Sequence, residues 1–191
     1  MTVMSTTTAG GRPFTVDDLI TMPDDGHRYE LLDGVLIVSP APGTRHQLAC
    51  VAIIVTLDGA CPDGMAVLTA PYAVQPSAST ELQPDVLVAR TTDLTEKNLP
   101  VAPLLAVELL SPSTALYDLN LKKAAYAQMG VASYWVVDPQ ELVLTVFELD
   151  SERSYQQIGQ VKGAEAFEAE RPYPVRIVPA ELVARLSGTD R

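Results

Sequence analysis

The chain has 191 residues, of which 47% are apolar and 19% are charged, and its 13 basic and 24 acidic residues give a formal net charge of −11. This length suits one domain with a single core, and this apolar content excludes a chain that is disordered throughout. The acidic balance argues against a surface built to hold a phosphate backbone, because such surfaces gather Lys and Arg. Here Lys122-Lys123 is the only adjacent basic pair.

The longest apolar run, residues 48–57, is shorter than the about 20 residues that a membrane-spanning helix needs. The first 11 residues lack the basic start and apolar stretch of a secretion signal. We therefore expect no membrane association and a cytoplasmic location, where Cys50 and Cys61 would be free thiols. We expect residues 1–14 to form a flexible tail and residues 15–191 a single domain.

The N-terminal part predicts a helix, a hairpin and a second, longer helix. Residues 16–20 fit a short helix capped by Thr15. Residues 29–32 and 35–38 flank Asp33-Gly34, which is the strongest short hairpin signal. Thr44 can cap a helix that runs to about Gly59, and its apolar residues leave so little polar surface that we expect it to be buried.

The remainder alternates apolar segments with one long helical segment. Six segments are predicted as strands, namely residues 65–69, 72–75, 84–89, 104–110, 133–138 and 142–147. The spacing of apolar residues predicts a helix over 117–129, which Gly130 ends. Strand-like pieces near 155–158 and 175–178 precede a short helix over 179–186. Hairpins combined with a helical crossover predict an α/β fold with a mixed central sheet flanked by helices and an N-terminal hairpin.

Glu108 is the one charged residue in the apolar segment 104–110. An ionised group buried there costs free energy unless it is paired or bound to a metal. A structural interpretation pairs Glu108 with an Arg or Lys from a neighbouring element. A functional interpretation makes it a metal ligand, and the residues alone leave both open.

Asp85 and Lys122 each have an ordinary interpretation beside a functional one. Asp85 starts an apolar strand and could simply cap its own turn, but two carboxylates on neighbouring strands are what Mg²⁺ needs. Asp118 and Lys122 lie four residues apart on the predicted helix, as in a surface salt bridge. Alternatively, Lys122 faces the sheet and orients a water or stabilises phosphate charge, while Lys123 points to solvent.

Glu30 and His46 are weaker candidates by themselves, because a Glu at a strand start is usually solvated and a lone His is usually structural. They belong to an ordered set of motifs: Tyr29-Glu30-Leu31-Leu32-Asp33-Gly34, His46, Pro84-Asp85-Val86, Val107-Glu108-Leu109-Leu110-Ser111-Pro112-Ser113-Thr114, Asp118 with Lys122 and Tyr126, and Gly130-Val131-Ala132-Ser133-Tyr134-Trp135-Val136-Val137-Asp138-Pro139. Over residues 16–149 this set resembles the Uma-type restriction endonuclease family, a domain of unknown function placed in the PD-(D/E)XK nuclease superfamily.

The resemblance implies a restriction-endonuclease-like fold in which Asp85 and Glu108 ligate a divalent metal, Mg²⁺ or Mn²⁺, with a carbonyl near Leu109 completing the site. Glu30 matches the upstream acidic position of the pattern. His46 and Asp118 would support the site. The Lys that the superfamily places two residues after the Glu is absent.

Leu110 stands at that position, and Lys122 on the next helix looks like its substitute. The resemblance thus implies a catalytic set of Asp85, Glu108 and Lys122 that hydrolyses phosphodiester bonds in DNA. The acidic surface and Leu110 favour a different hypothesis, an inactive binding or regulatory module with the same fold. A phosphodiesterase acting on RNA or nucleotides is a third hypothesis. Apolar strands after Tyr134 suggest a homodimer.

Overall fold

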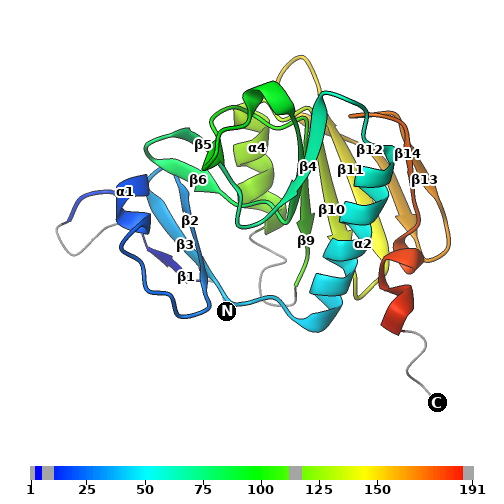
Figure 1. Ribbon diagram of the computed structural model, residues 1–191, viewed down its shortest axis with the longest axis horizontal. Coiled ribbons are helices and arrows are strands. Elements are labelled where there is room, and N and C mark those ends of the chain that lie inside the picture. Colours follow the sequence, from blue (N-terminus) through cyan, green and yellow to red (C-terminus); the bar gives the residue numbers. More distant parts are fainter. Residues whose placement is uncertain (1–2, 6–10, 112–117, 187–191) are drawn as a thin grey trace.

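A computed structural model describes residues 3–5, 11–111 and 118–186 of the chain (Figure 1). Its helical elements are α1 (Val16–Leu19), α2 (Thr44–Ala60), α4 (Lys123–Met129), the 3₁₀ segments η1 (Thr91–Asp93) and η3 (Pro179–Leu186), and the π-helical turn η2 (Asp118–Lys122). Its strands are β1 (Val3–Ser5), β2 (Arg28–Leu32), β3 (Val35–Ser39), β4 (Met65–Thr69), β5 (Ala73–Ser77), β6 (Thr80–Leu82), β7 (Val86–Arg90), β8 (Asn98–Leu99), β9 (Leu105–Leu109), β10 (Ser133–Asp138), β11 (Val143–Leu149), β12 (Tyr155–Lys162), β13 (Phe167–Ala169) and β14 (Val175–Ile177).

The strands form two larger sheets and one small ribbon. The central sheet has the order β12-β11-β10-β9-β7-β4, and the N-terminal sheet has the order β1-β3-β2-β6-β5-β8. In the central sheet β9 and β10 run parallel, and η2 and α4 lie between them in the chain. The other neighbours in that sheet are antiparallel. This mixed sheet with a helical crossover confirms the predicted fold class.

The two faces of the central sheet are covered differently. On one face, the α2 residues Ile53 and Leu57 are buried in a core cluster that also contains Trp135 of β10. Complete burial of each such side chain contributes about 1.5–3 kcal/mol. On the other face, Tyr126 of α4 shares a cluster with Leu82 of the N-terminal sheet. The second face is therefore where the two sheets and α4 meet.

The predicted hairpin is present and has the expected turn. Leu32 pairs with Val35, which leaves Asp33 and Gly34 as a two-residue turn with φ values of 50° and 80°. Positive φ at both positions is the geometry that matches the twist of the flanking strands. Arg28 and Glu30 lie on β2, so this turn fixes the register of both residues against β3.

The prediction that α2 is buried all round is wrong. Val51 and Val55 are 47% and 66% exposed, because a helix in an outer layer can bury only the face that it turns to the sheet. The N-cap residue is Gly43 and not Thr44. The short strands β6, β8 and β13 were not predicted, since two or three residues carry too little periodicity to be recognised.

The predicted N-terminal tail contains a strand. Residues Val3–Ser5 form β1, which pairs antiparallel with β3. The domain boundary near residue 15 and the homodimer stay predictions. No helix in the described ranges is long and apolar enough to cross a membrane.

We expect Gly34→Ala to lower the free energy of unfolding by about 1–2 kcal/mol, the usual cost of a left-handed conformation for a residue with a side chain. The added Cβ would also lie 2.8 Å from Cβ of Pro13. Urea denaturation measures the change. Gly59→Ala is the matched control, because Gly59 lies in α2 and a Cβ added there would meet nothing within 4 Å. An unchanged midpoint for Gly34→Ala would contradict the turn geometry.

Candidate active site

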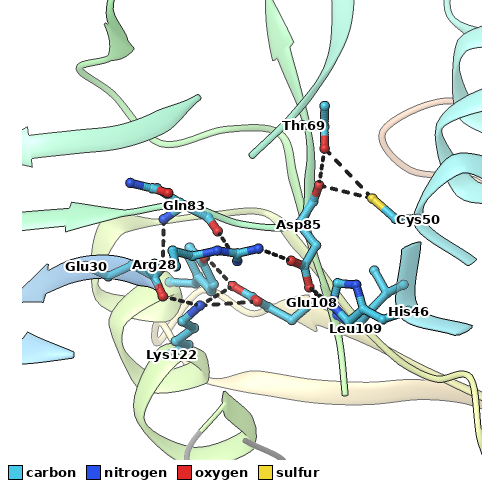
Figure 2. A network of polar contacts seen from close by, with 11 residues as sticks. Arg28, Glu30, His46, Cys50, Thr69, Gln83, Asp85, Glu108, Leu109 and Lys122 are labelled. Atoms are coloured by element: carbon cyan, nitrogen blue, oxygen red, sulfur yellow. Dashed lines mark hydrogen bonds and ion pairs between the residues drawn. The ribbon is translucent and has the colours of Figure 1, made fainter. Parts of the chain in front are cut away.

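The predicted site residues come from separate elements and meet on the face between the two sheets (Figure 2). Val86 of β7 pairs with Val107 of β9. In that register Asp85 and Glu108 are the next opposed residues, and side chains of opposed residues share a face. The sheet pairing alone therefore places the two carboxylates side by side.

Asp85 is held at both its backbone and its side chain. Its carbonyl oxygen accepts a hydrogen bond of 2.8 Å from the Thr69 hydroxyl. Its Oδ2 accepts from the backbone N–H of Leu109 at 2.8 Å and contacts Nε2 of His46 at 3.1 Å. Its Oδ1 accepts from Nη2 of Arg28 at 2.9 Å. Three neighbours thus fix the carboxylate, Thr69 fixes the backbone beside it, and the side chain is only 4% exposed.

Glu108 and Glu30 share one cation. Nζ of Lys122 donates to Oε1 of Glu108 at 3.1 Å and lies 3.0 Å from Oε2 of Glu30. Oε1 of Glu108 also accepts from the Tyr126 hydroxyl at 2.8 Å. Oε1 of Glu30 accepts from the backbone N–H of Gln83 at 2.8 Å. The ammonium group of Lys122 therefore bridges strands β2 and β9.

The cluster contains more negative than positive side chains. Three carboxylates, Glu30, Asp85 and Glu108, face the cations Arg28 and Lys122, and all three carboxylates are buried. Burial opposes the ionisation of Asp85, but the hydrogen bond from His46 and the charges of Arg28 and Lys122 outweigh it and hold its pKa well below the ordinary value. Asp85 is therefore an anion throughout the neutral pH range.

Arg28 and Tyr126 respond to the same negative charges. Burial works against the guanidinium of Arg28, but the carboxylates of Asp85, Glu30 and Glu108 prevail and raise its pKa. Burial raises the pKa of Tyr126 far above the ordinary value, and the charge of Glu108 raises it further. Tyr126 consequently stays a neutral hydrogen-bond donor to Glu108.

A cavity of about 190 Å³ opens above this cluster. The carboxylates of Asp85 and Glu108, the ammonium of Lys122 and the segment 39–43 before α2 line it. The first turn of α2 contributes His46. Within the described part of the chain, Nδ1 of His46 is buried without a hydrogen bond, and Oε2 of Glu30 has an ion pair with Lys122 but no hydrogen bond. Two residues that line the cavity therefore carry polar atoms with unused bonding capacity.

The donor chemistry of the cavity suits a hard divalent cation. Mg²⁺ is typically held by one or two carboxylates and completes its octahedron with waters, and Asp85 and Glu108 supply two carboxylates. Among the described residues no three His, Cys, Asp or Glu side chains form a ready-made metal cluster. A bound ion would therefore take most of its ligands from water, from the substrate or from the backbone.

The structure brings together five of the six predicted site residues, Glu30, His46, Asp85, Glu108 and Lys122. The side chain of Asp118 lies outside the described residues. Lys123 does not line the cavity, as predicted, but it is half-buried rather than solvated, and its Nζ lies 3.5 Å from the centre of the Phe147 ring.

Arg28 and Tyr126 were not predicted as site residues. A signal existed for each, since Arg28 lies two residues before Glu30 on one strand face and Tyr126 lies four residues after Lys122 on one helix face. Neither spacing could show which strand would lie opposite Arg28 or which carboxylate would accept a hydrogen bond from Tyr126.

Comparison with known proteins bears on the fold and the family of the chain. A crystal structure described as "a putative nuclease belonging to DUF820" from Anabaena variabilis superposes with a TM-score of 0.70 at 16% identity, over 91% of this chain and 99% of that chain. This likeness shows the restriction-endonuclease-like fold. A comparison with curated proteins gave no match. The profile of the Uma2 family, described as "Putative restriction endonuclease", matches residues 16–181. The chain therefore belongs to the Uma2 family of nuclease-fold proteins.

Proposed function

We propose that this chain is a divalent-metal-dependent endonuclease that hydrolyses phosphodiester bonds in DNA. The observation that carries the proposal is the meeting of Asp85, Glu108 and Lys122 at one cavity, from two neighbouring strands and the following helix. Membership of a family described by nuclease activity supports the same reaction class.

Each residue of the cluster has a separate task in this proposal. Asp85 and Glu108 would hold Mg²⁺ or Mn²⁺, and a carbonyl near Leu109 would be a further ligand. When bound, such an ion lowers the pKa of a water and offsets the charge of the scissile phosphate. Lys122 orients the attacking water or stabilises the negative charge that develops on the phosphate.

The remaining polar groups hold these residues in place. His46 fixes Oδ2 of Asp85, and the Tyr126 hydroxyl fixes Oε1 of Glu108. Glu30 lies beside Nζ of Lys122 and keeps it near the sheet. This arrangement restricts the rotation of each reacting side chain before substrate arrives.

The net charge of −11 bears on how the substrate binds. A protein with few phosphate contacts binds nucleic acid weakly, and its affinity falls with salt. Cleavage assays therefore belong at low ionic strength, with plasmid DNA, single-stranded DNA and RNA compared. Cleavage of RNA alone would select the phosphodiesterase hypothesis over the DNA endonuclease.

An inactive binding module is the second candidate, and two contacts favour it. Arg28 is bonded to Oδ1 of Asp85, and Lys122 is bonded to Glu108, so both proposed metal ligands already have a cation. A domain that had lost catalysis would retain such ion pairs to keep its buried carboxylates neutralised.

We expect Glu108→Gln to reduce metal-dependent cleavage of plasmid DNA at least about a hundredfold, because a neutral amide replaces a metal-binding carboxylate at nearly constant shape. Gel electrophoresis of the cleavage products in Mg²⁺ and Mn²⁺ measures the loss. Glu141→Gln is the matched control, because the side chain of Glu141 is 65% exposed and pairs with Lys162, which is not part of the cluster. Glu108→Ala tests the same position but also removes packing volume. Full activity in both Glu108 variants would reject the site.

We expect Lys122→Met to abolish cleavage and to lower the free energy of unfolding by about 3–5 kcal/mol, because Glu30 and Glu108 lose the cation that they share. Lys123→Met should lose only a cation–π contact with Phe147, about 0.5–1 kcal/mol. Thermal denaturation and the plasmid assay compare the two variants. If Lys123→Met were the more damaging change, the assignment of the two lysines would be reversed.

We expect calorimetric titration to detect binding of Mg²⁺ or Mn²⁺ at millimolar concentration by the wild-type protein, because Asp85 and Glu108 face one cavity. The Glu108→Gln variant should bind more weakly. Absence of binding by the wild-type protein would select the inactive module.

A further inference from the structure

The two oxygens of Asp85 have different kinds of partners. Oδ2 is held by the backbone N–H of Leu109 and by His46, which are fixed by the sheet and by α2. Oδ1 accepts its hydrogen bond from Arg28, a long side chain that can rotate away. Oδ1 is therefore the oxygen of Asp85 whose present partner a cation entering the cavity could replace.

Arg28 is the more accessible cation of the cluster. Its side chain is 21% exposed, compared with 5% for Lys122 and 4% for Asp85. Its second hydrogen bond, from Nη1 to the carbonyl oxygen of Gln83, is 3.0 Å long, and the charges of Glu30 and Glu108 also act on the guanidinium. Figure 2 shows the guanidinium lying between Gln83 and Asp85.

Arg28 also has space into which it can move. It lines the cavity above the cluster and a second cavity of about 430 Å³, which lies along α1 and the start of β2. Leu19, Ile20, Tyr29 and Gln83 are among the residues that line the second cavity. Arg28 thus lines both cavities.

From these contacts we propose that Arg28 is an exchangeable counter-ion, which a divalent cation displaces from Oδ1 of Asp85 and whose released guanidinium then binds a substrate phosphate. This inference rests on the proposed function for the ion and for the phosphate. Arg28 would thus pair first with the carboxylate of Asp85 and then with the substrate phosphate, which are both anions.

Electrostatics favours the exchange over simultaneous binding. Counted over the described side chains, the three carboxylates exceed the two cations by one charge, so a dication added to these five groups without any rearrangement would reverse the sign of their sum. Departure of Arg28 leaves Lys122 and the dication against the same three carboxylates, which balances the charge. A planar guanidinium then suits phosphate, because its N–H groups match two oxygens at once.

The first test measures Mn²⁺ binding by calorimetry in wild type, Arg28→Met and Arg28→Gln. Removal of the competing side chain should lower the Kd for Mn²⁺ about tenfold, the scale of a charge-assisted hydrogen bond that the ion no longer has to break. Arg90→Met is the matched control, since Arg90 ends β7 and its side chain is 61% exposed. An unchanged or higher Kd in both Arg28 variants would overturn the proposal.

Displacement itself has a spectroscopic signature. The Nε–Hε resonance of Arg28 can be assigned in a ¹⁵N spectrum by its absence from Arg28→Met and Arg28→Gln. Saturating Mg²⁺ should move or broaden this resonance in the wild-type protein. A resonance that Mg²⁺ leaves in place would mean that Arg28 stays on Asp85, and it would overturn the proposal even if Arg28→Met bound Mn²⁺ more tightly.

The second partner is tested with inorganic phosphate in saturating Mg²⁺. Arg28→Met should bind phosphate about tenfold more weakly than wild type, whereas Arg90→Met should bind it normally. Equal affinity for phosphate in wild type and Arg28→Met would overturn this half of the proposal.

The outcomes also separate this inference from the proposed nuclease. If Arg28 exchanges with the metal as expected but the wild-type protein cleaves no nucleic acid, the exchange stands and the endonuclease fails. If the wild-type protein cleaves DNA while Arg28 variants show unchanged Mn²⁺ affinity, the endonuclease stands and the exchange fails.

Discussion

The burial of three carboxylates in one small region is the constraint on which the rest of the structure depends. An unpaired carboxylate in such a place would be strongly destabilising, and each of the three must therefore find cations and hydrogen-bond donors. The hairpin β2–β3 brings Arg28 and Glu30, and the helical crossover brings Lys122 and Tyr126. The sheets are joined here by charge as well as by apolar packing, because Lys122 links a strand of each.

Much of the fold could be predicted, because its longer elements carry clear periodicity. The segment around Glu108 reads as a central strand, and β9 is buried along its whole length. Asp33-Gly34 specifies its turn through local backbone preferences alone. The exposure of Val51 and Val55 could not be predicted, since the sequence of α2 does not say on how many sides it has neighbours. The apolar residues of a helix show which faces it could bury. The elements packed against the helix determine which faces are buried.

The site was predictable to the extent that single residues conflict with their surroundings. Glu108 is a charge in an apolar strand, and both interpretations left open for it are compatible with what is seen, because it is paired with Lys122 and also lines a cavity. Asp85 became identifiable through its place in an ordered pattern. Arg28 stands at the start of a strand, where a charged residue is ordinary, so nothing in the neighbouring sequence marks it as a site residue. Its role depends on the position of β2 beside Gln83 and Asp85, which no local pattern encodes.

For the metal site proposed above, ion pairing within the cluster would separate folding from metal binding, two events that many metal sites combine. Where a carboxylate cluster lacks internal cations, the chain can complete its fold only after an ion arrives. Here Arg28 and Lys122 supply that positive charge from within the chain. We therefore expect the chain to fold without divalent ions, and the binding of a metal would then require the rotation of a side chain rather than the ordering of a domain.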